Sequence, residues 1–324
     1  MESIGTPIMW SVFIALVIAA LVIDLLVLKQ SGPHKVGMRE AGLWSVCWIG
    51  LALLFNAGLW WYLKGSIGDA EANRIGLEFL TGYLVEKALA VDNIFVFLMI
   101  FGYFAVPAQY QQRALIWGVV GAIALRAVMI FIGAALIAQF HWILYFFGAF
   151  LVLTGIKMLW AAGQQADLND NPILKWLRGH LRVTEKHHDE KLSVFENGKR
   201  FFTPMFLVLV MIAFTDVIFA VDSIPAIFAI TTDPFIVLTS NVFAVLGLRA
   251  LYFLLAGMAD RFHLLAYGLA LVLVFIGTKM LIVDFQKIPI GISLGVVAVL
   301  IASAMLLSLW IKPRTDDGEL GEVK

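Results

Sequence analysis

Cysteine is almost absent from this chain of 324 residues, which contains Cys47 and no other. A single thiol excludes an internal disulfide and any cluster of thiolate ligands for a metal or redox centre. We expect Cys47 to be a small buried apolar residue, the usual environment of a free cysteine. The sequence also has no Gly-rich dinucleotide motif and no histidine pair typical of haem ligation, so no redox cofactor is indicated.

Charge is scarce too. Charged residues make up 14% of the chain and hydrophobic residues 61%, whereas a soluble domain is about a quarter charged. The composition therefore indicates an integral membrane protein. The 23 basic and 23 acidic residues cancel, so the chain lacks the basic excess that nucleic-acid binding requires. The first apolar run has no basic leader and no cleavage site, which favours a membrane helix over a signal peptide.

Long apolar runs account for most of the chain. A spanning helix needs about 20 mostly apolar residues, and we predict nine such spans. One long polar segment, residues 163–201, separates the fifth span from the sixth and is the only region able to form a small soluble element. The predicted spans are roughly 7–28, 41–63, 78–104, 114–138, 142–162, 202–228, 235–258, 264–283 and 290–311.

Lysine and arginine are distributed unevenly between the two sides of these spans, and cytoplasmic connections carry the basic excess. The side of the N-terminus has three, Lys64, Arg74 and Lys287. We therefore predict an outside N-terminus, with the C-terminus and the polar loop in the cytoplasm. The other side has fifteen: Lys29, Lys35, Arg39, Arg113, Lys175, Arg178, Arg182, Lys186, Lys191, Lys199, Arg200, Arg261, Lys312, Arg314 and Lys324.

Three short motifs recur in the same order. "AVDN" at 90–93 returns as "AVDS" at 220–223, "LRA" at 125–127 returns at 248–250, and "GIKML" at 155–159 returns as "GTKML" at 277–281. The separations are 130, 123 and 122 residues. Spans three to five thus repeat as spans six to eight, and the repeats start on opposite sides of the membrane. Inverted repeats are typical of transporters with a site near the membrane midplane.

The predicted fold is an all-α polytopic membrane protein with about nine transmembrane helices and a 3+3 inverted-topology repeat. The organisation that follows is two helices in residues 1–63, the first repeat in 78–162, the cytoplasmic polar loop in 163–201, the second repeat in 202–283, and the last helix with a cytoplasmic tail in 284–324.

Four carboxylates lie near the middle of otherwise apolar spans: Glu86 and Asp92 in the first repeat, and Asp216 and Asp222 in the second. A charge at the bilayer centre costs about 2.5 kcal/mol or more, so together they represent on the order of 10 kcal/mol that other interactions must offset. Three explanations are open. The acids form structural pairs with intramembrane bases, they form a cation site, or they relay protons.

Structural pairing is limited by the supply of bases. Lys87 is adjacent to one acid, and Arg126 and Arg249 lie one span away from the acidic pairs. The other two bases within the spans, Lys157 and Lys279, lie near span ends and are expected to snorkel to the interface. We expect the two arginines to balance charge when a cation site is empty.

A cation site suits the available donors. Asn93, Ser223 and Thr215 supply oxygen atoms beside the acids, and hard divalent ions prefer oxygen ligands. No cysteine or histidine lies beside them, which favours manganese or magnesium over zinc or copper. Asp24 in the first span is either a further ligand or the partner of a base.

Helix geometry limits how the acids can meet. Glu86 and Asp92 are six residues apart, which is about 9 Å along a helix and about 120° around it. Either the acid-bearing helix is broken, or each repeat sends one acid to a shared ion. Pro225 removes a backbone donor near Asp222 and could free a carbonyl there. We expect a central ion between the repeats, held by acids from both.

The motifs "EKALAVDNIFVF" and "TDVIFAVDSIPAIFAITTDPF" resemble those of the TerC family of integral membrane proteins, and the similarity extends over nearly the whole chain. Thr215 stands where the family pattern has serine before the aspartate. The resemblance implies a bacterial inner-membrane exporter of manganese(II), with the family's acidic positions at Glu86, Asp92, Asp216 and Asp222. It also implies a link to tellurite resistance and, by the name of some members, to redox modulation.

The functional prediction is export of manganese(II) as the transported ion, coupled in one version to proton entry. No enzymatic activity and no permanently bound cofactor are indicated. The partners expected are the manganese ion and the lipid bilayer. Two alternatives stay open: a tellurite-resistance or redox-modulator factor that acts through partner proteins, and a membrane partner that loads metal into secreted enzymes.

Overall fold

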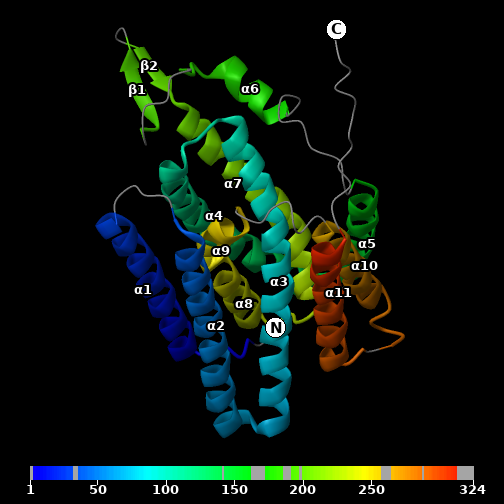
Figure 1. Ribbon diagram of the computed structural model, residues 1–324. Coiled ribbons are helices and arrows are strands. Elements are labelled where there is room, and N and C mark those ends of the chain that lie inside the picture. Colours follow the sequence, from blue (N-terminus) through cyan, green and yellow to red (C-terminus); the bar gives the residue numbers. More distant parts are fainter. Residues whose placement is uncertain are drawn as a thin grey trace.

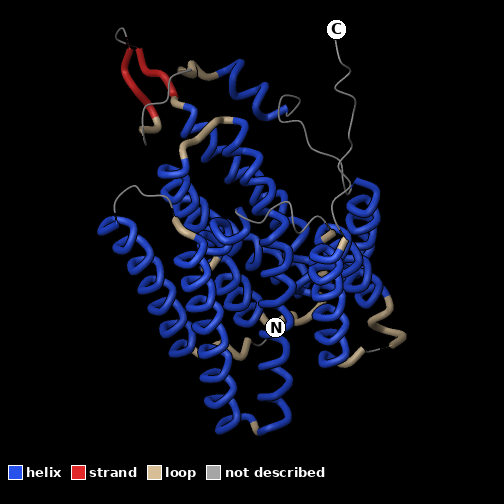
Figure 2. The backbone as a smooth tube through the Cα atoms, in the orientation of Figure 1, coloured by secondary structure: helices blue, strands red, loops and turns tan. Residues whose placement is uncertain are grey.

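The computed structural model describes residues 3–31, 36–140, 142–161, 172–184, 191–196, 199–256, 264–286 and 288–311, and they form a bundle of helices (Figure 1). Figure 2 shows how completely helix dominates the described chain. The helices are α1 (Pro7–Ser31), α2 (Met38–Ile67), α3 (Asp69–Tyr103), α4 (Ala108–Gln139), α5 (Ile143–Ala161), α6 (Pro172–His180), α7 (Pro204–Phe228), α8 (Pro234–Leu246), α9 (Leu248–Ala256), α10 (Leu265–Leu281) and α11 (Ile290–Trp310).

Within these ranges, six helices are long and apolar enough to cross a membrane: α1, α2, α4, α5, α7 and α11. The bent pair α8 and α9 makes a seventh if it counts as one span. Large apolar side chains such as Leu54, Leu153 and Val299 are more than 60% exposed on the outer helices, as expected for side chains that face lipid. The molecule is therefore a mostly helical, multi-pass membrane protein.

The polar loop is only partly described, and that part contains the exception to the helical fold. Strands β1 (Ser193–Glu196) and β2 (Lys199–Phe202) pair antiparallel, with Ser193 opposite Phe202. Together with α6 they lie at one end of the bundle, far from the connection between α2 and α3 (Figure 1). Thr203 then caps α7 by accepting a hydrogen bond from the backbone N–H of Phe206, at 3.4 Å.

The acid-bearing helices are continuous. Helix α3 runs for 35 residues through Glu86, and α7 runs for 25 residues with Pro225 inside it. Of the two alternatives raised by the six-residue spacing, a break at the acids is therefore wrong. The break lies instead between α8 and α9, where the chain bends by 42° around Gly247. A Cβ at Gly247 would lie 3.0 Å from the Cβ of Trp48, so a larger residue does not fit at the bend.

Helices α5 and α10 pack backbone to backbone through glycine. A Cβ added at Gly277 would lie 2.7 Å from the carbonyl oxygen of Gly148, and one at Gly148 would lie 3.0 Å from the carbonyl oxygen of Gly277. One at Gly155 would lie 2.8 Å from the carbonyl oxygen of Ala270. Small residues permit this close approach. Because lipid provides no hydrophobic driving force between helices, the van der Waals contacts made here hold the two helices together.

We expect Gly277→Ala to lower the stability of the protein in detergent, because the added methyl group meets rigid backbone and the helices must separate. Overpacking of this kind costs about 1–3 kcal/mol. The matched control is Gly121→Ala in α4, where a Cβ meets nothing within 4 Å. The measurement is the thermal midpoint of the purified protein. Equal midpoints for the two variants would show that α5 and α10 are not packed as described.

Candidate functional site

A buried ion-pair cluster joins α3, α4, α7 and α8 in the centre of the bundle. Arg126 of α4 is 1% exposed and donates to Glu86 of α3 through Nη1. The same nitrogen donates to Oδ1 of Asn241 at 3.0 Å, and Nη2 donates to Oδ1 of Asp216 at 3.4 Å. One arginine thus connects an acid from each of the two similar sequence motifs, which the sequence separates by 130 residues.

Each of these two carboxylates has one oxygen free for another ligand. Among the residues that the structure describes, Oε2 of Glu86 and Oδ2 of Asp216 are buried and accept no hydrogen bond. The hydroxyl of Ser223 is also buried without a partner there. Unsatisfied buried oxygens are costly and call for a physical explanation. The cluster thus has two carboxyl groups for one arginine, a ratio that favours a further cation.

The remaining predicted ligands stand as follows. Asn93 is buried in α3. The hydroxyl of Thr215 donates to the carbonyl of Met211 at 2.7 Å, so its proton is used within α7. Asp92 and Asp222 lie on α3 and α7, but their side chains fall outside the described residues. Over the part that is described, no three His, Cys, Asp or Glu side chains are grouped so as to hold a metal.

Arg249 does not join the central cluster. It donates to Asp24 of α1, and both side chains are buried. Of the two alternatives for Asp24, the partner of a base is therefore the one observed. The expectation that Arg249 balances the paired acids of the repeats is not met in this conformation, because its guanidinium is engaged with α1. This pair ties α1 to α9.

Lys87 lies at the C-terminal end of α8, where the chain bends. Its position next to Glu86 in the sequence does not predict this contact. Its ammonium donates to the carbonyl of Ala244 at 3.1 Å, in the last turn of α8. Carbonyls at a helix end lack intrahelical partners and attract cations. A Cβ at Gly247 would lie 2.7 Å from Lys87 Nζ, so the bend leaves room for the ammonium.

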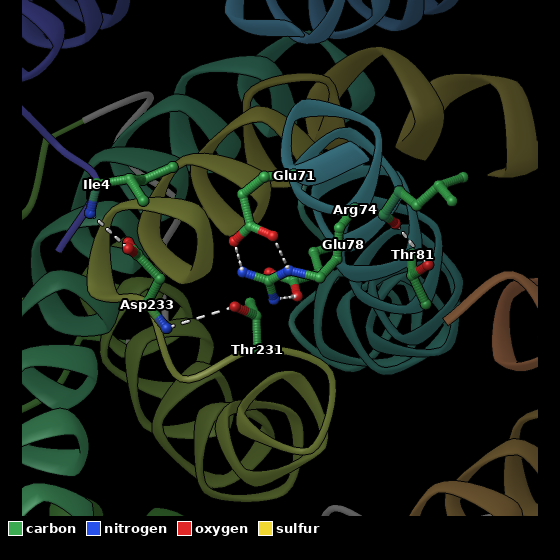
Figure 3. Close-up of polar contacts among 8 residues, drawn as sticks. Ile4, Glu71, Arg74, Glu78, Thr81, Thr231 and Asp233 are labelled. Carbon is green, nitrogen blue, oxygen red and sulfur yellow. Dashed lines mark hydrogen bonds and ion pairs between the residues drawn. The ribbon is translucent and has the colours of Figure 1, made fainter. Parts of the chain in front are cut away.

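A second ion network lies in the first turns of α3 (Figure 3). Arg74 Nε donates to Oε2 of Glu71 at 3.0 Å, and its two terminal nitrogens donate to Glu71 and to Glu78. Arg74 lies before the predicted span, and the hydrogen bond it donates lowers the pKa of Glu71, so that carboxylate stays ionised at neutral pH. The sequence prediction treats Arg74 only as a base in a connection. The available signal is its spacing, three residues after Glu71 and four before Glu78, which places all three on one helix face.

Comparison with known proteins agrees with the motif evidence. Residues 71–316 match the family described as "Integral membrane protein TerC family". The chain belongs to this family. A protein of Escherichia coli O157:H7 named "Putative membrane-bound redox modulator Alx" is 55% identical over 321 residues, covering 99% of this chain and 100% of the relative. No solved structure matches the chain.

A more distant relative covers nearly as much of the chain. An "Uncharacterized membrane protein" of Rickettsia felis is 39% identical over 307 residues, covering 95% of this chain and 99% of the relative. The family match begins at Glu71, near the start of α3, and includes every helix that contributes to the central cluster. Helices α1 and α2 precede the matched residues. Asp24 is therefore a partner of Arg249 that lies outside the part of the chain matched to the family.

Proposed function

We propose that this TerC-family protein exports manganese(II) from the cytoplasm through a site between Glu86 and Asp216. The observation that carries the proposal is the central cluster, in which two buried carboxylates share one arginine and each keeps a free oxygen. Asp92, Asp222, Asn93 and Ser223 complete the site in this proposal. The protein lies in the bacterial inner membrane, with the N-terminus outside and the C-terminus cytoplasmic.

Nine passes are required, two more than the seven described above when the α8 and α9 pair counts as one. Helix α3 is 35 residues long, about 52 Å at 1.5 Å per residue, although its charged side chains lower its hydropathy. Helix α10 has 17 residues, about 25 Å, and packs along α5 through the glycine contacts described above. Counting α3 as a pass puts α6 and the strands on the side opposite the N-terminus, in agreement with the distribution of basic residues. Counting α10 as well puts the C-terminus on that same side.

Reciprocal contacts support an inverted repeat. Gly148 meets Gly277, and Gly155 meets Ala270; adding 122 to 148 and 155 gives 270 and 277. The two contacts are thus exchanged by the repeat, as an approximate two-fold axis requires. Similarly, Gly82 faces Ser240 and Gly118 faces Ile212. Positions 82 and 212 differ by 130, and positions 118 and 240 differ by 122. Both separations fall within one residue of those of the sequence motifs.

Manganese suits the chemistry of the cluster. The free groups are carboxylate and hydroxyl oxygens, the donors that manganese and magnesium prefer. The charge of two carboxylates equals that of one divalent ion. One arginine neutralises only one of the two carboxylates. We infer that Arg126 holds the carboxylates in the empty state and yields them when the ion arrives. Transporter sites of this kind lie at the repeat interface, where the two halves rock to expose the ion to each side in turn.

The experiment that tests the proposal is the metal content of cells after a manganese load. Cells that lack the protein are compared with cells that express it, and first-row metals and magnesium are measured together. We expect lower manganese in the expressing cells and unchanged magnesium, iron and zinc. Unchanged manganese, with the protein present in the membrane, would contradict export.

The same experiment addresses the redox-modulator alternative suggested by the name of the relatives. Cys47 is exposed on α2, so the expectation of a buried thiol is wrong. Export through carboxylates does not need it. We therefore expect Cys47→Ser to lower cellular manganese as far as the wild type does. A loss of function in this variant, at equal protein level, would favour thiol chemistry.

A further inference from the structure

A polar cavity of about 710 Å³ lies at the end of the bundle where α3 begins. Its walls come from the start of α3, the connection between α7 and α8, the first turn of α8 and the end of α10. The charged side chains that line it are Glu71, Arg74, Glu78, Asp233 and Lys279. In the proposed orientation this cavity opens on the extracytoplasmic side.

Helix α8 connects the cavity to the central cluster over a short distance. Ile236 lines the cavity, and Asn241 accepts a hydrogen bond from Arg126. These two residues are five positions apart in one helix, which is about 7.5 Å along its axis. Ser240 lies between them and is fully buried. A Cβ added at Gly82 of α3 would lie 2.9 Å from its hydroxyl oxygen, so α3 and α8 are in tight contact at this level. We call this closed stretch, from Ile236 to Asn241, the passage.

Helix α3 presents a buried carboxylate at each end of this passage. Glu78 is 5% exposed and Glu86 is fully buried. They are eight residues apart, which is about 12 Å along the helix. Each is held by an arginine, Arg74 for the outer carboxylate and Arg126 for the inner one. The outer end of the passage therefore repeats the pairing seen in the cluster.

Asp233 is not available as an ion ligand. Its carboxylate accepts from the backbone N–H groups of Ile4 at 2.7 Å and Phe235 at 2.8 Å, and it caps α8. Arg74 differs because it is half exposed, and its guanidinium lies between exposed Glu71 and buried Glu78 (Figure 3). The side chain of Arg74 can therefore move away from Glu78 toward solvent while its ion pair with Glu71 persists.

We propose that this cavity is the outer mouth of the ion path and that Arg74 is its gate. In the described conformation the guanidinium covers the carboxylate of Glu78 and blocks a cation from reaching or leaving the passage. Opening transfers Arg74 to Glu71 alone and frees Glu78 for the departing divalent ion. The identity of the ion rests on the proposed function, whereas the gate itself rests on the cavity and the ion pairs.

The test measures access to Ser240 from outside. A Ser240→Cys reporter is placed in a Cys47→Ser background, and whole cells are treated with a membrane-impermeant cationic thiol reagent. We expect Arg74→Gln to increase the labelling rate of the reporter at least threefold, because Glu78 is uncovered. Glu71→Gln is a second variant that removes only the exposed partner of Arg74. It can be used if Arg74→Gln does not accumulate in the membrane. This variant should slow labelling, because Arg74 loses its outward acceptor.

Lys64→Gln is the matched control. It removes another cation at the same end of the bundle, whose partner Asp69 lies 3.4 Å away and outside the cavity. Its labelling rate should equal that of the parent. Equal rates for the parent, Arg74→Gln and Glu71→Gln would overturn the gate. Faster labelling in Arg74→Gln together with slower labelling in Glu71→Gln supports the gate, even if manganese content does not respond to the protein. That combination would count against manganese export alone.

Discussion

Replacing Arg126 with methionine is expected to reduce the amount of folded protein in the membrane severely. Arg126 is the shared partner of Glu86 and Asp216, and all three are buried. Removing one member of a buried ion pair leaves an uncompensated charge and costs about 3–5 kcal/mol. That is a large fraction of the 5–15 kcal/mol by which a typical protein is stable. The measurement is membrane abundance together with the thermal midpoint in detergent.

The control for this experiment is Arg39→Met, which removes an exposed arginine at the start of α2 and should change neither quantity. A second variant, Arg126→Met combined with Glu86→Gln, should recover part of the lost stability, because one of the two unpaired charges is gone. Coupling between the two sites is expected because they are in contact. If Arg126→Met were as abundant and as stable as the wild type, the central cluster would not be assembled as described.

Neutralising the carboxylates one at a time is expected to abolish manganese export with a smaller effect on abundance. Glu86→Gln and Asp216→Asn keep the size of the side chain, and Arg126 retains the other acid as its partner. Each change makes the cluster neutral, so a divalent ion is no longer balanced. We expect at least a tenfold lower efflux rate in cells loaded with manganese. Asp92→Asn and Asp222→Asn should behave alike if their acids complete the site.

Asp69→Asn is the matched control for these variants. Asp69 is an exposed acid at the start of α3, paired with Lys64, and its loss should leave efflux unchanged. Variants of Glu86 and Asp216 that accumulate normally and still export manganese at the wild-type rate would show that the acids are structural. The search for function would then move to the polar loop.

The sequence predicted the parts of the fold that depend on hydrophobic runs and local motifs. The predicted span at 202–228 corresponds to α7 at Pro204–Phe228, because an apolar run with a threonine cap and a proline at its start has few alternatives. The acid motifs pointed to Glu86 and Asp216, since charges in such runs are costly enough to be informative. Glu86 and Asp216 share Arg126 as a partner, whereas the expectation that acids from both repeats hold one ion stays a prediction.

Other features depended on long-range packing that spacing does not encode. The choice of Asp24 as the partner of Arg249 is set by how α1 lies against the bundle. The bend at Gly247 was missed because Pro225 offered the more obvious breaking residue, yet α7 continues through it. The cavity beside Arg74 depends on the connection between α7 and α8, which brings Thr231 and Asp233 to the start of α3.

The most direct test of the central claim is manganese flux in proteoliposomes that contain only the purified protein. Vesicles are loaded with a manganese-sensitive dye, and flux is recorded for the wild type, Glu86→Gln and Asp69→Asn under an imposed manganese gradient, with magnesium as the competing ion. We predict saturable flux for the wild type and Asp69→Asn, and none for Glu86→Gln. Equal flux through Glu86→Gln, or no flux above that of empty vesicles for any protein, would contradict a carboxylate transport site.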